Sequence, residues 1–423
     1  MGYNFYMKST KSKAKYFQFS SYKVAKDRKT LKFHYSVGLN DQKRQNFSET
    51  LVLPQKIVFR DANHKKLIES CLQNLHLMLG ISYWKMYCPP KIIISTLRLS
   101  KKQSEFWNTV YTKGLAEFFY KNKIDFRSLI KFPFKKNISI KTYHLLRENK
   151  ALIGIGGGKD SAVAVEMLKE KDILFKGFVV ESSKNTEIIR QMTRKMGIKA
   201  FIIDRKLDPQ LLRLNKTKGV FNGHVPISAL QAFIALLLGV LYGYAKIFTA
   251  NEQSANEGNV SYLGTTINHQ WSKSEEFEKL FQIYINQFIT PEIIFKSIIR
   301  SLSEIQIMQI FSKLKKYHPI FSSCNVNFRI QNATVQNKRW CGDCPKCLFV
   351  FILLAAFLPK KEVLKIFSEN LLDKISLLSI FKQLTGREGS KPFECVGTAK
   401  EVKMALSLIR RKKEFTNDYL MKQ

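Results

Sequence analysis

A glycine-rich turn between an apolar run and an amphipathic segment constrains this chain more than any other feature. Ala151–Ile155 is apolar, three glycines follow, and Lys159, Asp160 and Ser161 open a segment with helical spacing. A strand, a tight turn and a helix N-terminus in this order let backbone N–H groups converge on an anion, and the helix dipole adds positive potential. The sequence therefore predicts a phosphate-binding turn, to which Lys159 adds a mobile charge and Ser161 a hydroxyl.

The order of residues separates this turn from the two commonest phosphate-binding motifs. GxxxxGK[ST] needs its lysine directly before Ser or Thr, and GxGxxG needs a third glycine near Asp160. The turn instead resembles the SGGxDS pyrophosphate loop of the ATP pyrophosphatase superfamily, with Gly156 in place of the usual serine. That resemblance implies cleavage of ATP between its α and β phosphates and transfer of AMP to a substrate oxygen. The nucleotide contacts expected here are Gly156, Gly157, Gly158, Lys159, Asp160 and Ser161.

Length and charge bound the class of protein without choosing its partner. With 423 residues the chain can hold two or three domains. A net charge of +37 favours polyanionic partners, which include nucleic acid, anionic lipid and phosphorylated small molecules. Lysine, phenylalanine, isoleucine and asparagine are all abundant, as a genome-wide compositional bias would also produce. The charge alone therefore does not select or exclude nucleic acid.

Apolar segments and cysteines indicate the compartment. Met1–Ser20 is dotted with lysines and lacks the apolar run of a secretory signal. Ile227–Ala245 contains a glutamine and two glycines, and Leu348–Leu358 is too short to cross a bilayer, so both are expected to be buried core helices. Seven cysteines, four of them clustered, indicate a reducing compartment and metal binding rather than disulfides. We expect a cytoplasmic protein without a membrane span.

The first third, residues 1–146, reads as an N-terminal α+β module. Aromatic and β-branched runs separated by polar, lysine-rich turns are typical of strands. The elements expected are strands at Tyr16–Phe19, Leu31–Val37 and Leu51–Phe59 and helices at Lys65–Tyr87 and Gln103–Tyr120. No catalytic signature occurs in this third, which favours a role in substrate recognition or packing.

Residues 147–320 alternate between strand and helix patterns. The expected strands are Leu152–Ile155, Phe175–Glu181, Lys199–Asp204 and Lys246–Ala250. Such alternation predicts an α/β domain in which a parallel sheet carries helices on both faces, as in the adenine nucleotide alpha hydrolase-like fold of pyrophosphate-loop enzymes. Ligands then bind beyond the carboxyl ends of the strands. The glycine turn, Glu181–Ser183, Asp204 and Asn251 share that edge, and Glu181 is expected to contact the nucleotide.

The C-terminal region, residues 321–423, is expected to be helical and to carry a metal site. The helical pattern starts at Glu292, and Ser301 with Glu304 fits a capping box. Cysteines at a spacing typical of metal ligands follow in this region. The candidate ligands are Cys324, Cys341, Cys344 and Cys347. Four thiolates suit a structural, tetrahedral Zn²⁺, while an iron–sulfur cluster and unmetallated thiols stay open as alternatives.

A polar series between the turn and the cysteines offers further ligands. Asn251–Asn259 directly follows a buried strand and contains two carboxylates and several amides. Such groups can hold Mg²⁺ through water or hydrogen-bond an amino-acid substrate, and the alternative is a solvated turn. Lys273 either binds a phosphate or carboxylate or lies on the surface, and His224 is either a general acid–base or a turn residue. The candidate substrate contacts are Asn251, Ser254, Asn256 and Lys273.

Taken together, eight motifs resemble one family. They are GGGKDS, NGHVP, NEQSANEGN, QWSKSEEFE, FSSCN, WCGDCPKCLFVF, NLLD and KPFECVG. In this order, from about residue 150 to 400, they resemble the ATP-dependent UDP-N-acetylmuramoyl-L-alanyl-L-glutamate epimerases of bacterial peptidoglycan synthesis. The resemblance implies inversion of the terminal L-glutamate to D-glutamate, with Mg²⁺ as a cofactor and with ATP converted to AMP and pyrophosphate.

The implied chemistry needs a residue that moves the α-proton. Conversion of the substrate carboxylate to an acyl adenylate makes the neighbouring C–H far more acidic, after which a base removes the proton and an acid returns one from the opposite face. The candidates are His224, Glu252, Glu257 and Cys395. A buried structural role is the alternative for Cys395. The implied partner is the UDP-linked muramoyl dipeptide.

Three other classes remain as alternatives at this stage. A tRNA-modifying pyrophosphate-loop enzyme, either a thiolase or similar to lysidine synthetase, fits the basic charge. A 7-cyano-7-deazaguanine synthase fits one cysteine followed by CxxCxxC, although sixteen residues between Cys324 and Cys341 is a longer gap than in those enzymes. A non-enzymatic nucleotide-binding module would bind ATP without forming AMP.

Overall fold

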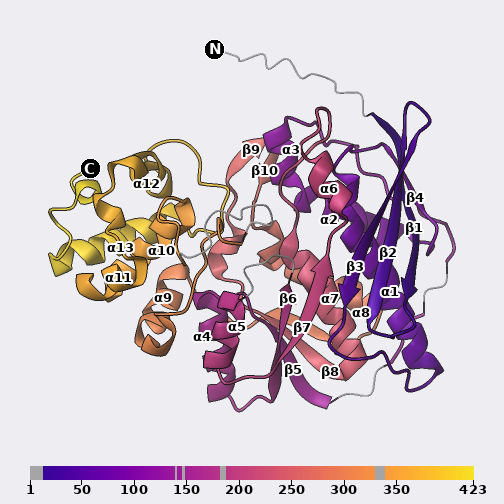
Figure 1. The fold of residues 1–423 in the computed structure, drawn as a ribbon, viewed down its shortest axis with the longest axis horizontal. Coiled ribbons are helices and arrows are strands. Elements are labelled where there is room, and N and C mark those ends of the chain that lie inside the picture. Colours follow the sequence, from indigo (N-terminus) through magenta and orange to yellow (C-terminus); the bar gives the residue numbers. More distant parts are fainter. Residues whose placement is uncertain (1–12, 139–140, 145–147, 182–186, 329–338) are drawn as a thin grey trace.

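One nine-stranded sheet runs through the molecule (Figure 1). The structure, a computed structural model, describes residues 13–138, 141–144, 148–181, 187–328 and 339–423. In spatial order its strands are β11 (Ile294–Ser297), β8 (Tyr244–Thr249), β5 (Glu148–Gly154), β6 (Phe175–Glu181), β7 (Ala200–Lys206), β3 (Arg44–Val52), β2 (Thr30–Leu39), β1 (Ala14–Val24) and β4 (Lys91–Ile94). A separate two-stranded sheet consists of β9 (Val260–Tyr262) and β10 (Thr265–Ile267).

The sheet is mixed, and its parallel part is the one that the sequence predicts. Strands β11, β8, β5, β6 and β7 pair in parallel, which confirms the parallel arrangement expected for residues 147–320. Strand β3 then pairs antiparallel with β7, with Leu51 opposite Arg205, and β2 and β1 follow in antiparallel order. The N-terminal strands therefore continue the same sheet, which is mixed as a whole, whereas the sequence analysis above treats them as a module beside the parallel sheet.

Helices cover both faces of the sheet. The helices of the described residues, including the C-terminal ones that lie away from the sheet, are α1 (Ala62–Trp84), α2 (Lys101–Gly114), α3 (Ala116–Asn122), α4 (Lys159–Glu170), α5 (Glu187–Lys195), α6 (Pro209–Leu214), α7 (Ile227–Tyr242), α8 (Glu275–Phe288), α9 (Glu304–Lys313), α10 (Pro345–Phe357), α11 (Lys360–Phe367), α12 (Leu378–Leu384) and α13 (Ala399–Lys412). Along β5, Leu152 belongs to the core shared with α1 and α7, while Ala151 and Ile153 belong to the core shared with α4 and α10. This alternation places the end of β5 between two packed layers.

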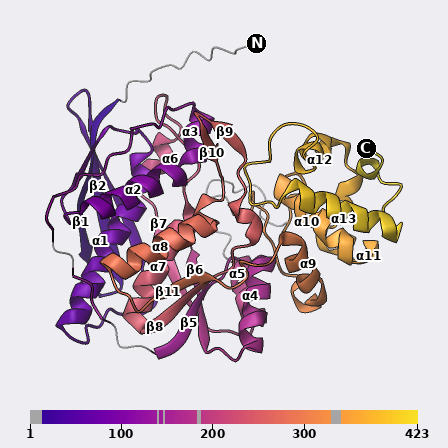
Figure 2. The ribbon, with the colours of Figure 1, turned by 180° about the vertical axis from the view of Figure 1, so that it is seen from behind.

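The C-terminal helices gather at the opposite end of the molecule from the N-terminal strands, as Figure 1 and the reverse view in Figure 2 both show. Helix α9 packs on α4, and α10 packs on α9 and α13. Helices α7 and α10 are apolar on all sides and almost completely buried, as expected for core helices. Among the described residues, no helix combines the length and apolarity needed to cross a bilayer.

Three local predictions are wrong. The third N-terminal strand is Arg44–Val52 rather than Leu51–Phe59, because polar and buried residues alternate along Arg44–Val52, whereas Val58 is exposed. Strand β11 interrupts the region expected to be helical from Glu292. The capping box of α9 is formed by Ser303 and Gln306, not by Ser301 and Glu304, so Glu304 begins the helix itself. Ser183 of the predicted ligand edge lies outside the described residues.

Candidate active site

The sheet topology places the glycine turn at the switch point of the parallel strands. From β5 the chain adds β6 and β7 on one side and β8 and β11 on the other, and the crevice at such a reversal is where open α/β sheets bind ligands. Gly157 has φ +82°, and a Cβ on Gly158 would lie 3.3 Å from Ser323 Cβ. A Cβ on Gly156 would meet nothing within 4 Å, so the serine usual in this motif would also fit there.

A cavity of about 260 Å³ opens at this edge. The glycine turn contributes Gly156 and Gly158, and Asp160 and Ser161 of the first turn of α4 also line it. Its apolar wall includes Phe178, Val180, Ala232, Ala235 and Phe295. Its further polar lining includes Asn251, Lys273, Lys346 and Cys395. Segments far apart in the sequence therefore meet at one concave surface, as the shared strand edge predicts.

Lys159 is engaged in ion pairs beneath the turn. Its side chain is fully buried, and its Nζ bonds Oδ1 of Asp160 and Oε2 of Glu304. Burial opposes its charge, but Asp160 and Glu304 outweigh this effect and raise the pKa of Lys159. Lys159 is not among the described residues that line the cavity. It therefore positions Asp160 and the start of α4, whereas the glycine-turn motif predicts that it contacts the phosphates.

Two other lysines face the cavity. Lys346 Nζ bonds the backbone oxygen of Cys395 and lies 3.9 Å from Glu304 Oε1. Burial opposes the charge of Lys273, but Cys395, Glu252 and Asp160 outweigh it and raise the pKa of Lys273. Lys273 and Lys346 thus line the cavity with basic side chains, and the binding role of Lys273 stays a prediction.

Cys395 lies at the end of a chain of three titratable side chains. Its Sγ is 3.9 Å from Nε2 of His269, and Nδ1 of His269 bonds Oε2 of Glu117. Burial opposes the thiolate, but Lys273, His269 and Lys346 outweigh it and lower the pKa of Cys395 to about 6. Burial likewise opposes the imidazolium, but Cys395 and Glu117 raise the pKa of His269 to about 9. At neutral pH the pair is a thiolate and an imidazolium.

His224 contacts the same carboxylate but not the cysteine. Its Nδ1 lies 3.3 Å from Oε2 of Glu117, and its ring centroid is 4.7 Å from that of His269. Burial, followed by the charge of His269, lowers the pKa of His224 to about 3. His224 is therefore neutral near pH 7. It contacts Glu117 and is not among the described residues that line the cavity.

Of the residues that follow β8, some line the cavity and others are buried outside its wall. Asn251 lines the cavity, and its backbone N–H donates to Ser297 Oγ at 2.9 Å. Glu252 and Ser254 are buried, and their Oε2 and Oγ atoms have no hydrogen-bond partner among the described residues. Arg300 donates to the backbone oxygen of Glu252 at 2.8 Å and fixes this segment. Neither Glu252 nor Ser254 is among the described residues that line the cavity, although both follow Asn251 closely in the chain.

Three of the predicted site residues have other partners. Glu181 forms a two-point ion pair with Arg190, at 2.8 and 2.7 Å. Asn256 accepts a hydrogen bond from the backbone of α8 at 2.8 Å and lines a second cavity beside α2 and α8. Glu257 is half-exposed and lies 3.6 Å from Lys391. None of the three lies among the described residues around the first cavity.

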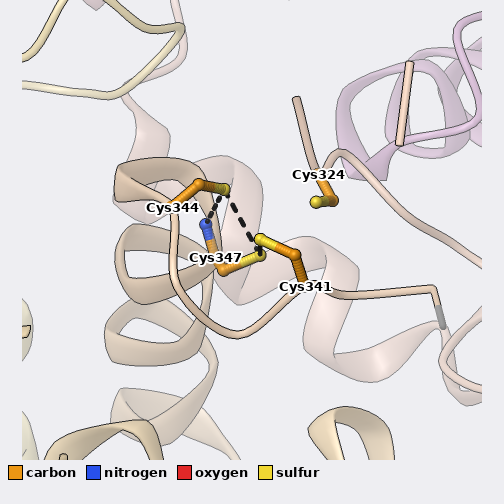
Figure 3. A group of neighbouring side chains, drawn as sticks. All are labelled: Cys324, Cys341, Cys344 and Cys347. Atoms are coloured by element: carbon orange, nitrogen blue, oxygen red, sulfur yellow. Dashed lines mark hydrogen bonds between the residues drawn. The ribbon is translucent and has the colours of Figure 1, made fainter. Parts of the chain in front are cut away.

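The four predicted metal ligands converge (Figure 3). Cys341, Cys344 and Cys347 come from one loop and the first turn of α10, and Cys324 approaches from a separate segment. Their Sγ atoms lie within 4.8 Å of one another, and Cys347 Sγ is 3.7 Å from Cys341 Sγ and 3.5 Å from Cys344 Sγ. A tetrahedral zinc with Zn–S bonds of about 2.3 Å places sulfurs about 3.8 Å apart. The cluster could therefore hold zinc.

Comparison with known proteins identifies the family. A model described as the MurL N-terminal domain matches residues 8–298, and one described as the MurL C-terminal domain matches residues 320–423. The chain belongs to the MurL family. This finding confirms the family resemblance of the sequence motifs. The cavity draws on both matched segments, since the MurL N-terminal match contains the glycine turn, Glu117 and His269, and the C-terminal match contains Lys346 and Cys395.

Three relatives carry the name UDP-N-acetyl-alpha-D-muramoyl-L-alanyl-L-glutamate epimerase. The protein from Xanthomonas oryzae pv. oryzae is 34% identical over 89% of this chain and 82% of the relative. Those from Salinispora tropica and a Micromonospora species are each 32% identical over 93% of this chain, covering 84% and 86% of the relatives. The N-terminal strands lie within the MurL N-terminal match, residues 8–298.

Proposed function

We propose that this chain is an epimerase that inverts the terminal L-glutamate of UDP-MurNAc-L-Ala-L-Glu through an acyl-adenylate intermediate. ATP would be converted to AMP and pyrophosphate, and the product would serve as a peptidoglycan precursor. The observation that carries the proposal is one cavity bounded by the glycine turn and by Cys395. The names of the relatives support this substrate. ATP dependence and the pyrophosphate-loop fold are proposed from the turn and its place at the switch point.

The reaction requires activation because a carboxylate resists further negative charge. Attack of the substrate carboxylate on the α-phosphate forms a mixed anhydride, expels pyrophosphate and removes the negative charge next to the α-carbon. Backbone N–H groups of Gly156–Gly158 and the Ser161 hydroxyl would hold the pyrophosphate, and Lys273 and Lys346 would balance its charge. The apolar wall around Phe178 and Val180 offers a surface for the adenine ring.

Carboxylates at the strand edge fit a magnesium ion. Oxygen ligands are those that Mg²⁺ prefers, and the buried Oε2 of Glu252 lacks a hydrogen-bond partner among the described residues. Asp160, in the cavity wall, is the second donor. We propose that Asp160 and Glu252 hold Mg²⁺, which would neutralise phosphate charge when bound. Asn251 lines the cavity and would orient the substrate, and we propose the buried Ser254 as a second substrate contact.

Cys395 is the proton-transfer residue that we propose. Of the four catalytic candidates, all within the described residues, Cys395 lines the cavity and has a thiolate at neutral pH. Glu257 is half-exposed, and His224 lies behind His269. Glu252 is assigned instead to the metal.

We assign each of the three parts of the chain a different role in the proposed reaction. We propose that residues 1–146 help to recognise the UDP-muramoyl part, that 147–320 bind ATP, and that 321–423 support the site through the cysteine cluster. Glu117 of the first part already reaches Cys395 through His269. The UDP group is anionic and matches the excess of basic residues. Because its proposed substrates are nucleotides, we propose that the protein acts in the cytoplasm.

Supplying UDP-MurNAc-L-Ala-L-Glu with ATP and Mg²⁺ should yield AMP, pyrophosphate and the D-glutamate diastereomer. The products are separated by chiral chromatography after acid hydrolysis, with nucleotide release measured in parallel. The free dipeptide L-Ala-L-Glu is the matched control and should react far more slowly because it lacks the UDP-muramoyl group. An inert UDP-linked substrate, with ATP uncleaved, would contradict the proposal.

We propose that the cysteine cluster holds a structural zinc. Purified protein should contain about one zinc per chain, as a single four-thiolate site requires, and Cys344→Ser should lose it and unfold at lower temperature. AMP formation should also fall, because Lys346 lies between two of the ligands. Mass spectrometry of the metal content is the measurement, with Cys71→Ser, a buried cysteine outside the cluster, as the control. Iron with a visible chromophore, or zinc retained in Cys344→Ser, would refute the zinc site.

A further inference from the structure

The fold gathers three titratable side chains that are remote in the sequence. Glu117 lies on α3, His269 precedes the short 3₁₀ helix Trp271–Lys273, and Cys395 lies in the loop before α13. Glu117 and His269 are 152 positions apart, and His269 and Cys395 are 126 positions apart. Their contacts run in the order Cys395, His269, Glu117, and Cys395 is the member in the cavity wall.

The hydrogen bond to Glu117 determines which ring nitrogen of His269 lies toward the sulfur of Cys395. An ionised carboxylate only accepts hydrogen bonds, so Nδ1 of His269 carries a proton. Nε2 is then the atom that meets Cys395, and in the imidazolium form it donates toward the thiolate. A reactive group, an imidazole and an orienting carboxylate in this order are the arrangement by which enzymes activate cysteine and serine nucleophiles.

The surrounding charges complete this arrangement. Lys273 faces the sulfur from the 3₁₀ helix, and Lys346 of α10 bonds the backbone oxygen of Cys395. Lys121 of α3 bonds Oε1 of Glu117 at 2.5 Å, and His224, which is neutral near pH 7, approaches Oε2. Glu117 is thus fixed on both oxygens, while the sulfur faces positive groups.

We infer that Glu117 and His269 are positioning residues that hold Cys395 as the thiolate which removes the α-proton of the adenylated glutamate. This inference rests on the proposed function. In the step, the Cα–H bond breaks, an S–H bond forms on Cys395, and the electron pair enters the enolate of the acyl adenylate. A solvent-derived proton then reaches the opposite face of Cα, and water cleaves the mixed anhydride to release AMP.

Alkylation of Cys395 tests the inference without substrate. Iodoacetamide is applied between pH 4.5 and 9.5, and modification at Cys395 is followed by peptide mass spectrometry. In the wild-type protein the rate should rise with a midpoint near pH 6. Cys71, which is buried and whose pKa is raised by burial, is the internal control and should stay unmodified. His269→Gln removes the imidazolium, and Glu117→Gln removes the carboxylate that favours the protonated imidazole. Each variant should therefore move the midpoint for Cys395 alkylation upward by about one pH unit or more.

A matched variant separates this effect from the removal of any buried histidine. His318 is buried, bonds the backbone oxygen of Phe311 and lies in the α9 region. His318→Gln should therefore leave the Cys395 midpoint unchanged. A wild-type midpoint near the ordinary thiol value of about 8.5, or an unchanged midpoint in both His269→Gln and Glu117→Gln, would overturn the inference. The wild-type titration needs no variant, so it gives a result even if a substitution prevents folding.

Kinetics then connect the thiolate with the proposed reaction. His269→Gln should lower kcat for inversion about 10- to 100-fold, with KM for the UDP-linked substrate and the rate of AMP release nearly unchanged. A fall in AMP release as large as that in inversion would contradict a positioning role toward Cys395. A low alkylation midpoint without epimerase activity would leave the thiolate intact and refute the proposed function instead.

Discussion

Replacement of Lys159 by methionine is expected to abolish AMP formation and to lower the free energy of unfolding. Lys159 is fully buried and is the shared cation of Asp160 and Glu304. Removing one partner of a buried ion pair costs about 3–5 kcal/mol because a charge is left uncompensated. Asp160 would also lose the group that fixes it in the cavity wall, so AMP formation should fall at least about 100-fold. Thermal unfolding and nucleotide release are measured on the same preparation.

Two further variants separate stability from chemistry in this experiment. Lys159→Met combined with Glu304→Gln removes both members of the buried pair and should recover much of the stability, but not AMP formation. Lys85→Met is the matched control, because Lys85 is also buried but contacts Asn222 rather than a carboxylate. That variant should retain AMP formation. If the double variant recovered AMP formation together with stability, Lys159 would have a structural role alone.

The parallel part of the fold was predictable because its signals are local. Apolar runs of strand length alternate with amphipathic helices from β5 to β8, and Phe175–Glu181 coincides with β6. The pairing of β3 with β7 was not predictable, since a hydrogen-bonded ladder between remote segments leaves no periodic pattern in either segment. The capping box of α9 was misplaced because Ser301 and Ser303 both precede a residue with a side-chain acceptor at the required spacing.

The parts of the site that were predictable are those in which binding depends on a local sequence pattern, either glycines that shape the backbone or cysteines at metal-ligand spacing. Three glycines before a helix and a CxxCxxC series are such patterns, and the four cysteines converge as expected. Glu304, Glu117 and Lys346 were missed because each is an ordinary charged residue in a helix, and their importance arises from burial beside a partner remote in sequence. His269 had one available signal, its position directly before the QWSKSEEFE motif.

Cys395→Ser is expected to stop inversion while ATP cleavage continues. A serine hydroxyl keeps nearly the same size but is not ionised near neutral pH, so the base that removes the α-proton is lost. General base catalysis contributes about 10²–10⁴-fold, and we expect inversion to fall by about 10³-fold. The adenylate can still form at the glycine turn and be cleaved by water, so AMP release should persist. Chiral analysis of the glutamate gives the rate of inversion. Nucleotide release, measured in the same reaction, gives the rate of ATP cleavage.

Deuterium incorporation from D₂O at Cα of the glutamate shows whether the Cα–H bond has been broken. With the wild-type protein in D₂O, the D-glutamate product should carry one deuterium at Cα, because its proton arrives from solvent on the face opposite Cys395. L-glutamate recovered from a Cys395→Ser reaction should contain none, since its Cα–H bond is not broken. Ser104→Ala, which removes a buried hydroxyl bonded to the backbone oxygen of Phe132, away from the cavity, serves as a control and should preserve both inversion and labelling. Loss of AMP release together with inversion in Cys395→Ser would mean that the thiol acts on the adenylate itself, as a nucleophile, and would exclude the role of proton carrier.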